Sequence, residues 1–242
     1  MADAEVKPQR KDLPVEQARA ELSRHFSEYR GSEYAEGWAK LWSQGDFLPW
    51  DRFAPSPALA DTLVNHVELV GHALVEENGE KRRKRALVPG CGRGVDVLLL
   101  ESFGYDVVGL EYAEGAFKAA QEYAAEHAKE YPVHDEKVGK GSRKFVRGDF
   151  YKDEWLVDAG LEKDTKFDLI YDYTNLLQME HLSHPGVEIK YNDAGSVMMN
   201  PFAPDSPNAL ERVGHWHPAD THKVGKDADG NVEDYIAVWR HH

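Results

Sequence analysis

The stretch Ala86-Leu87-Val88-Pro89-Gly90-Cys91-Gly92-Arg93-Gly94 decides the fold of this 242-residue chain. It reads as a short apolar strand that runs into a glycine-rich loop, and residues 95–102 then follow a helical pattern. Glycines let the backbone turn sharply and approach a ligand closely, and the helix that follows turns its free N–H groups toward the same place. The stretch therefore predicts a binding site at the carboxyl end of the strand.

An acid lies at the distance that this kind of site requires. Residues 106–111 read as a second strand, and its last residue, Glu111, follows Gly90 by 21 positions. A carboxylate there can accept hydrogen bonds from both hydroxyls of a ribose. The loop glycines are spaced Gly-x-Gly-x-Gly, because position 95 is Val, and this order fits S-adenosylmethionine better than a dinucleotide. We therefore predict a nucleoside-type cofactor.

A third strand brings a second acid to the same edge of the sheet. Residues 144–147 read as that strand, and Asp149-Phe150 follow it. The carboxylate can reach an adenine amino group and the aromatic ring can cover the base, although a helix N-cap is the alternative role for Asp149. The register with Glu111 and with the glycine loop favours adenine binding.

Strand and helix patterns alternate through the rest of the chain. Residues 113–131 are helical, 167–173 read as a fourth strand and 235–239 as a last one. This alternation is typical of βαβ units, so we expect an α/β fold with a parallel central sheet that is covered on both faces. Upstream, apolar spacing predicts three helices, over 15–29, from Tyr34 to the Gly45-Asp46 turn, and over 56–76.

The composition narrows the classes of partner. Hydrophobic residues are 41% and charged residues 30%, as in an ordinary globular protein, and the net charge is −14. An acidic chain repels phosphate backbones and anionic lipid, so neither nucleic acid nor a membrane is expected as a partner. No apolar run approaches the ~20 residues of a membrane helix, and we expect a soluble, cytoplasmic protein. A single cysteine excludes an intramolecular disulfide and a Cys-cluster metal site.

Short motifs distributed from Gly37 to Arg240 identify a family. They are Gly37-Trp38-x-x-Leu41-Trp42, Pro49-Trp50-Asp51, Ser56-Pro57-Ala58-Leu59, Leu87-Val88-Pro89-Gly90-Cys91-Gly92, Val108-Gly109-Leu110-Glu111, Gly148-Asp149-Phe150, Phe167-Asp168-Leu169-Ile170-Tyr171-Asp172-Tyr173, Thr221-His222-Lys223-Val224-Gly225 and Ile236-Ala237-Val238-Trp239-Arg240. With these motifs the chain resembles the thiol methyltransferase family, which is thiopurine methyltransferase-like and includes plant and fungal thiol, halide and thiocyanate methyltransferases.

The resemblance implies a Rossmann-like class I S-adenosylmethionine-dependent methyltransferase. Its sheet is then parallel with a reversed C-terminal strand, and an N-terminal helical cap covers the site. The resemblance also implies which residues contact the cofactor, S-adenosylmethionine, or its product, S-adenosylhomocysteine. They are Trp38, Trp42, Trp50, Gly90, Gly92, Glu111, Asp149, Phe150 and Tyr173. Trp38 and Trp42 are four residues apart and share a helix face, where they form either an aromatic lid or part of the core. Tyr173 and Asp172, where the crevice opens, are the predicted catalytic residues.

The connection after the fourth strand is too short for the family pattern. A βαβ crossover takes roughly 30 residues, whereas Thr174 to Pro185 is a dozen, and the chain then resumes a later part of the pattern. The fifth-strand region, with its helix and a substrate loop, is therefore expected to be missing. Its loss exposes an apolar sheet edge, which pairing of two chains into a homodimer would cover.

Three other features are interpreted as structural. His215, His217 and His222 lack acidic or Cys partners at metal-ligand spacing, so no metal site is predicted. The basic run 81–85 is a nuclear address or, as we prefer, a solvated turn. Cys91 lies inside the glycine loop, where a nucleophile would collide with the cofactor.

We therefore expect residues 1–14 to form a flexible arm and 15–242 a single methyltransferase domain, with a helical cap over 15–80 and a Rossmann-like core over 81–242. The expected reaction is methyl transfer from S-adenosylmethionine to a small soft nucleophile, a thiol or else halide or thiocyanate. Two alternatives remain at this point. One is a weak or inactive cofactor-binding regulator or subunit, and the other is an O- or N-methyltransferase of a small metabolite.

Overall fold

Four parallel strands form the central sheet of the computed structural model, which describes residues 13–30, 33–173 and 210–241. In spatial order they are β5 (Arg143–Arg147), β4 (Asp106–Glu111), β3 (Arg85–Pro89) and β6 (Leu169–Ile170). The chain steps outward from β3 through β4 to β5 and then returns to the other side of β3 as β6. A crevice opens at the carboxyl ends of the strands where the direction of winding reverses, here between β3 and β6. The predicted parallel sheet is confirmed.

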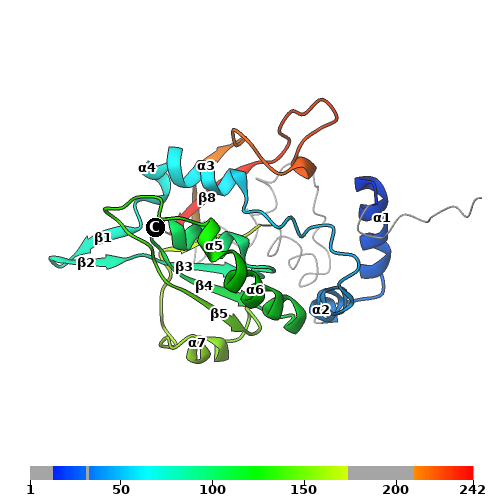
Figure 1. Cartoon of the computed structure of the whole chain (residues 1–242), viewed down its shortest axis with the longest axis horizontal. Coiled ribbons are helices and arrows are strands. Elements are labelled where there is room, and N and C mark those ends of the chain that lie inside the picture. The colour runs from blue at the N-terminus through cyan, green and yellow to red at the C-terminus, as the bar shows by residue number, and fades with distance from the viewer. Residues whose placement is uncertain (1–12, 31–32, 174–209, 242) are drawn as a thin grey trace, which may run out of the picture.

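Alternating apolar residues bury both faces of this sheet. Val88 and Val107 pack on one face beneath α5, α6 and α3, while Leu87 and Val108 pack on the other with α7. Figure 1 shows α5 and α6 on one side of the strands and α7 on the other. The helices are α3 (Pro57–Asn65), α5 (Val95–Ser102), α6 (Glu114–His127, followed by the 3-10 turn η3, Ala128–Glu130) and α7 (Glu154–Asp158).

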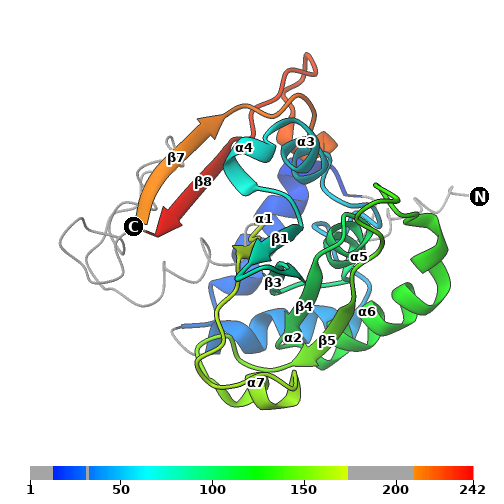
Figure 2. The same cartoon turned by 90° about the vertical axis from the view of Figure 1, so that its left-hand side faces the viewer.

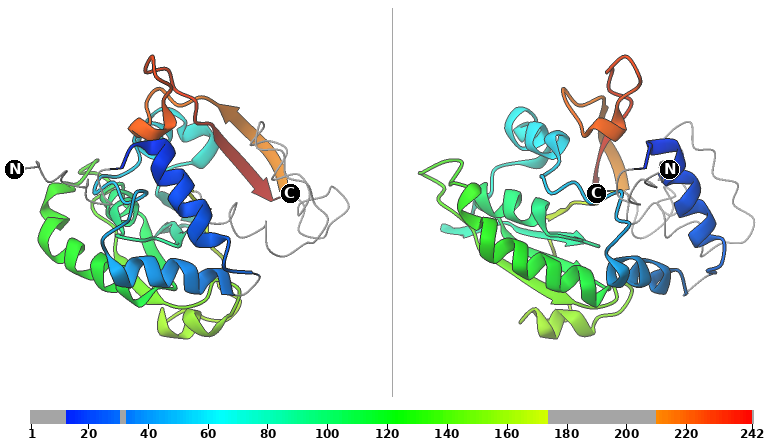
Figure 3. Two further views of the ribbon diagram at one scale, coloured as in Figure 1. Left: turned by 90° about the vertical axis from the view of Figure 1, so that its right-hand side faces the viewer. Right: turned by 45° about the vertical axis from the view of Figure 1, so that its right-hand side comes forward.

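Two helices form a cap beyond the carboxyl ends of the strands. They are α1 (Val15–Phe26) and α2 (Tyr34–Gln44), drawn in blue in Figure 3. Helix α2 ends where predicted, because Gly45 takes the left-handed conformation with φ 68°. It rests on the start of α6 so closely that a Cβ on Gly115 would lie 3.0 Å from the carbonyl oxygen of Trp42. This backbone contact fixes the aromatic face of α2 relative to the sheet.

The predicted long helix over 56–76 is wrong beyond Asn65. Helix α3 ends there because His66 leaves the helical region, with φ −125° and ψ 38°. A one-turn helix, α4 (Val67–Val70), follows, and the chain then forms a hairpin of β1 (Leu74–Glu77) and β2 (Glu80–Arg83). Asn78 and Gly79 both have positive φ, 56° and 83°, as the two-residue hairpin turn requires. The basic run 81–85 is therefore largely strand, not a turn.

The C-terminal strand is antiparallel, but it does not lie in the central sheet. Strand β8 (Ile236–His241) pairs with β7 (Leu210–Trp216) in a separate two-stranded ribbon, and the 3-10 turn η4 (Lys223–Gly225) lies between them. Figure 2 shows this ribbon beside α4. The ring of Trp216 packs against the ring of His66, with centroids 4.1 Å apart and the planes tilted by 32°, which attaches the ribbon to the helical layer. The reversed strand of the central sheet is thus a prediction that the described residues correct.

The fourth strand is shorter than predicted, since only Leu169–Ile170 of residues 167–173 are strand. The short connection from Thr174 to Pro185 and most of the predicted arm over 1–14 lie outside the described residues. Within the described ranges, every helix is too short or too polar to span a bilayer.

Candidate active site

A cavity of about 700 Å³ opens at the carboxyl ends of all four central strands. Each strand contributes the residues that follow it, and α2 and the segment after it close the cavity from the cap side. The lining includes every predicted cofactor residue: Trp38, Trp42, Trp50, Gly90, Gly92, Glu111, Asp149, Phe150 and Tyr173. Residues predicted from separate motifs, more than 130 positions apart in the sequence, are therefore brought to one site.

The glycine loop needs its glycines for two physical reasons. Gly90, Gly92 and Gly94 have φ of 58°, 53° and 76°, a region that side chains with a Cβ rarely adopt. A Cβ on Gly92 would lie 3.3 Å from Cζ2 of Trp42, and one on Gly94 would lie 2.6 Å from Cε1 of Phe145. The loop is thus held between the cap and the sheet.

Glu111 ends β4 as a buried carboxylate with a relative exposure of 7%. Its Oε2 accepts a hydrogen bond of 2.9 Å from the N–H of Gly92, and its Oε1 accepts one of 2.9 Å from the N–H of Ala113. Burial raises the pKa of Glu111, and these N–H donors oppose that rise. Each carboxylate oxygen can accept a second hydrogen bond, so the group both braces the loop and can bind hydroxyls.

Asp149 and Phe150 border the same cavity after β5. The carboxylate of Asp149 accepts a hydrogen bond of 3.0 Å from the N–H of Tyr151, and it pairs with Nζ of Lys152 at 3.1 Å. It therefore stabilises a turn, whereas the N-cap position of α7 belongs to Asp153. The alternative role as a helix N-cap is not the one observed.

The three tryptophans of the cap border the cavity, and two of them, Trp38 and Trp50, also pack against a small core cluster. Trp38 lies edge-on to Trp50, with ring centroids 4.8 Å apart, and 4.5 Å from the ring of Phe26. Trp42 and Trp50 are 6.2 Å apart. A row of packed rings thus supplies one wall of the cavity, and the role of these residues as a lid over a cofactor stays a prediction.

Of the two residues predicted to be catalytic after the fourth strand, one lines the cavity and the other does not. Tyr173 borders the cavity, and burial raises the pKa of its hydroxyl to about 12. Its ring lies 6.1 Å from that of His222, which comes from the C-terminal region. Asp172, the other predicted catalytic residue, is not among the residues that line the cavity.

Three charged residues that the sequence analysis did not select as site residues also border the cavity. Arg93 pairs with Asp51 at 2.6 Å, Arg52 lies near Tyr173 and His222, and Asp96 projects from the first turn of α5. Oδ1 of Asp96 accepts a hydrogen bond of 2.7 Å from the N–H of Ser56, and burial raises its pKa to about 6. A lone acid in the apolar run Val95–Leu100 was the available signal for this residue.

The histidines of the C-terminal region have aromatic neighbours. His215 and His217 both pack against Tyr235, with ring centroids 4.9 and 3.8 Å apart. Among the residues that the structure describes, no three metal-binding side chains gather in one place.

The sheet order, the glycine loop and the acid at the end of β4 define a Rossmann-like fold of the class I methyltransferase kind. Residues 34–185 match the family described as Thiopurine S-methyltransferase, which is more than half of the chain. The chain therefore belongs to the thiopurine S-methyltransferase family, a family of S-adenosylmethionine-dependent methyltransferases.

Individual relatives agree with this assignment. Probable thiol methyltransferase 2 of Arabidopsis thaliana is 28% identical over 204 residues, which are 84% of this chain and 70% of that protein. Thiocyanate methyltransferase 1 of Brassica oleracea is 32% identical over 150 residues, 62% of this chain and 52% of that protein. The chain thus spans about half the length of the thiocyanate methyltransferase.

A solved structure is more distant. A SAM-dependent methyltransferase from Anabaena variabilis is 17% identical, with a TM-score of 0.37 over 88% of this chain and 98% of that one. So low a score carries no weight, and the fold assignment rests on the strand order and the family match.

Proposed function

We propose that this chain transfers the methyl group of S-adenosylmethionine to a thiol or a similar soft nucleophile. The observation that carries the proposal is Glu111, which braces the glycine loop from inside a cavity walled by cap tryptophans. The cavity is large enough for a nucleoside cofactor, and the glycine loop lines it with backbone alone at Gly90 and Gly92. The residues present therefore fit the cofactor that the family uses.

Separate residues hold separate parts of the cofactor in this proposal. Glu111 accepts the ribose hydroxyls, Asp149 and Phe150 hold the adenine, and the cap tryptophans cover the bound molecule and exclude water. When bound, S-adenosylmethionine supplies a methyl group that its sulfonium charge has already activated for in-line displacement. The protein then mainly aligns donor and acceptor, and a soft anion needs no strong general base.

The acceptor is proposed to enter beside Tyr173. Within the described ranges Arg52 forms no ion pair, whereas the two other Lys and Arg residues of the lining, Arg93 and Lys152, are paired with Asp51 and Asp149. Burial and the charge of Arg52 both lower the pKa of the nearby His222, so this imidazole is neutral at pH 7. Arg52 is therefore the cation available to attract an anionic acceptor such as a thiolate or thiocyanate.

Calorimetry and an acceptor screen test the proposed function. S-adenosylhomocysteine should bind the purified chain in the micromolar range or tighter, and hydrosulfide, iodide, thiocyanate and an aromatic thiol should be methylated to different extents. Cofactor binding without turnover on any of them would indicate the regulator alternative. Methylation of hydroxyl or amine acceptors alone would indicate the other enzyme class. Absence of cofactor binding would contradict the proposal outright.

The same preparation tests the proposed homodimer. Light scattering should report twice the mass of one chain if a second copy covers the edge of the sheet. A monomeric mass contradicts the homodimer and leaves the methyl-transfer proposal intact.

A further inference from the structure

One carboxylate in the cavity has a single hydrogen-bond donor and no charged partner within the described ranges. Asp96 belongs to α5, where the next residues, Val97 to Leu100, are apolar and buried. Its one hydrogen bond within the described ranges comes from the N–H of Ser56, at 2.7 Å, and no ion pair involves it there. The side chain borders the cavity.

The other carboxylates of the lining are compensated. Asp51 pairs with Arg93 at 2.6 Å, and Asp149 pairs with Lys152 at 3.1 Å. Glu111 accepts two backbone N–H groups at 2.9 Å. A half-buried carboxylate that lacks a cation is costly for the folded protein, and a charged ligand that supplies one removes that cost. Asp96 therefore marks a place for a cation.

The strand order says which part of a ligand would lie there. Glu111 ends β4 and Asp149 follows β5, so a nucleoside held by both residues has its ribose over β4 and its base toward β5. The remaining end of the ligand then extends the other way, over β3 and β6. Asp96 lies on this side, in the helix after β3 and close to Tyr171 after β6.

We propose that Asp96 binds the ammonium group at the amino-acid end of the cofactor. This inference rests on the proposed function, because it takes S-adenosylmethionine and S-adenosylhomocysteine as the ligands. Both carry a free ammonium at the end that is distant from adenine. The ion pair would form inside a cavity, where it is stronger than at an exposed surface.

The test compares two ligands that differ at this end. S-adenosylhomocysteine carries the amino-acid group, whereas 5′-methylthioadenosine has the same nucleoside without it. Asp96→Asn removes the charge while its Oδ1 can still accept the hydrogen bond from Ser56, so the local structure is retained. By calorimetry, the substitution should weaken S-adenosylhomocysteine at least tenfold and change 5′-methylthioadenosine less than twofold.

A control variant separates this proposal from the proposed function. Glu111→Gln should weaken both ligands, because both carry the ribose. Equal losses for the two ligands in Asp96→Asn, or no loss for either, would overturn the role of Asp96 while leaving cofactor binding established. If the unsubstituted chain binds neither ligand, both proposals fail together.

A change in the ligand, rather than in the protein, tests the same contact in the unsubstituted chain and so does not depend on how a variant folds. S-adenosylhomocysteine that lacks only its amino group should bind the unsubstituted chain at least tenfold more weakly than the parent ligand. The same comparison in Asp96→Asn should show a much smaller difference, since the partner of the ammonium is gone. An undiminished difference in the variant would assign the ammonium to another group.

Discussion

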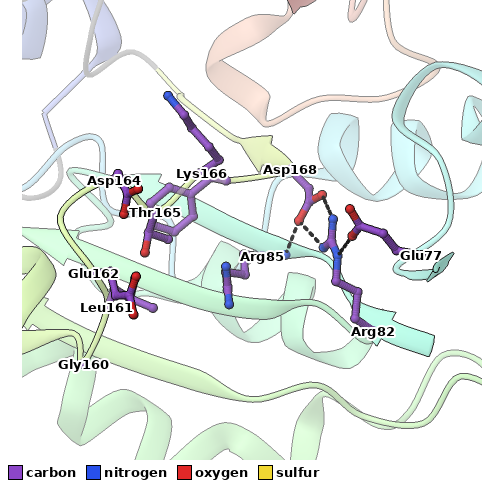
Figure 4. A pocket seen from close by; sticks show the side chains of 11 residues that line it. Glu77, Arg82, Arg85, Gly160, Leu161, Glu162, Asp164, Thr165, Lys166 and Asp168 are labelled. Carbon is purple, nitrogen blue, oxygen red and sulfur yellow. Dashed lines mark hydrogen bonds and ion pairs between the residues drawn. The ribbon is translucent and has the colours of Figure 1, made fainter. Parts of the chain in front are cut away.

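Acidic side chains at the two ends of the central sheet differ in whether a cation lies beside them. At the amino ends of β3 and β6, a polar cavity of about 620 Å³ contains Asp168, which accepts hydrogen bonds of 2.8 and 2.9 Å from Arg82, while Glu77 accepts another of 2.6 Å (Figure 4). At the carboxyl ends, Asp96 is half-buried and Glu111 is buried, and backbone N–H groups rather than cations contact their carboxylates. The acid at the amino end is therefore paired with arginine, whereas these two acids at the carboxyl end have no cation beside them.

The pKa values follow this difference. Burial tends to raise the pKa of Asp168, but the hydrogen bonds from Arg82 and from the N–H of Arg85 outweigh burial and lower it. Burial raises the pKa of Asp96 to about 6. A carboxylate that is already paired with a cation serves stability, whereas one that is withdrawn from water without a cation lowers stability and is useful mainly to a ligand. Four substitutions test this contrast.

The largest effect is expected from Asp96→Asn on the free protein. Between the ordinary value of 3.8 and about 6, the folded chain holds a proton on Asp96 that the unfolded chain has released, so its stability falls as pH rises through that interval. Removing the charge should raise the free energy of unfolding above pH 6 by at most about 3 kcal/mol, and hardly at all at pH 4. Urea unfolding across this pH range measures the gain, and a destabilised variant at pH 7.5 would show that the carboxylate is structural.

The second-largest effect is expected from Glu111→Ala, on the affinity for the cofactor. The substitution removes the acceptor for two ribose hydroxyls, and hydrogen bonds to a charged group contribute about 1.5–3 kcal/mol. The affinity for S-adenosylhomocysteine should fall at least tenfold by calorimetry. The N–H groups of Gly92 and Ala113 also lose their acceptor, so circular dichroism is needed to show that the loop region stays folded. Unchanged affinity in a folded variant would remove Glu111 from the cofactor site.

Arg52→Gln should have a smaller effect, confined to the acceptor. We expect KM for thiocyanate to rise about threefold to tenfold, because an exposed cation attracts an anion by roughly 1 kcal/mol. The affinity for S-adenosylhomocysteine should stay within twofold, and added salt should reduce the difference in KM. If cofactor affinity falls instead, Arg52 belongs to the carboxylate of the cofactor and not to the acceptor.

Local patterns predicted the centre of the fold well. The strand over 106–111 and the helix over 95–102 have the predicted bounds, because apolar spacing defines both segments and the glycine loop marks where the helix begins. The helix over 56–76 failed because its apolar spacing continues past His66, where the backbone departs from helical geometry. The Asn78-Gly79 dipeptide signals a hairpin, but the basic run after it favoured a turn over a strand.

The site likewise contains residues that the sequence predicts and one that it does not. Glu111 and Asp149 were predictable because each follows a strand, and parallel strands bring their carboxyl ends to one edge. Asp96 was not, since an acid in the first turn of a helix is common for electrostatic reasons alone. Its carboxylate accepts a hydrogen bond from Ser56, 40 positions earlier, and local spacing does not reveal such a contact.

The smallest effect is expected at the amino end of the sheet, from Asp168→Asn. Asn can still accept the hydrogen bond from the N–H of Arg85, so the change removes mainly the charge that pairs with Arg82. Because the Arg82 side chain is 44% exposed, water screens the pair, and the loss of stability at pH 7 should be about 0.5 kcal/mol.

The pH dependence of this effect is opposite to that expected for Asp96. The pKa of Asp168 is lowered, so the stability that its charge contributes is present above the unfolded pKa and disappears as pH falls through the folded pKa. The stability difference between Asp168→Asn and the unsubstituted chain should therefore vanish on acidification, whereas the gain from Asp96→Asn appears only as pH rises. Urea unfolding of Asp168→Asn below about pH 3 and at pH 7.5, and of Asp96→Asn at pH 4 and pH 7.5, compares the two ends of the sheet directly, and the same sign of pH dependence at both would contradict the contrast between them.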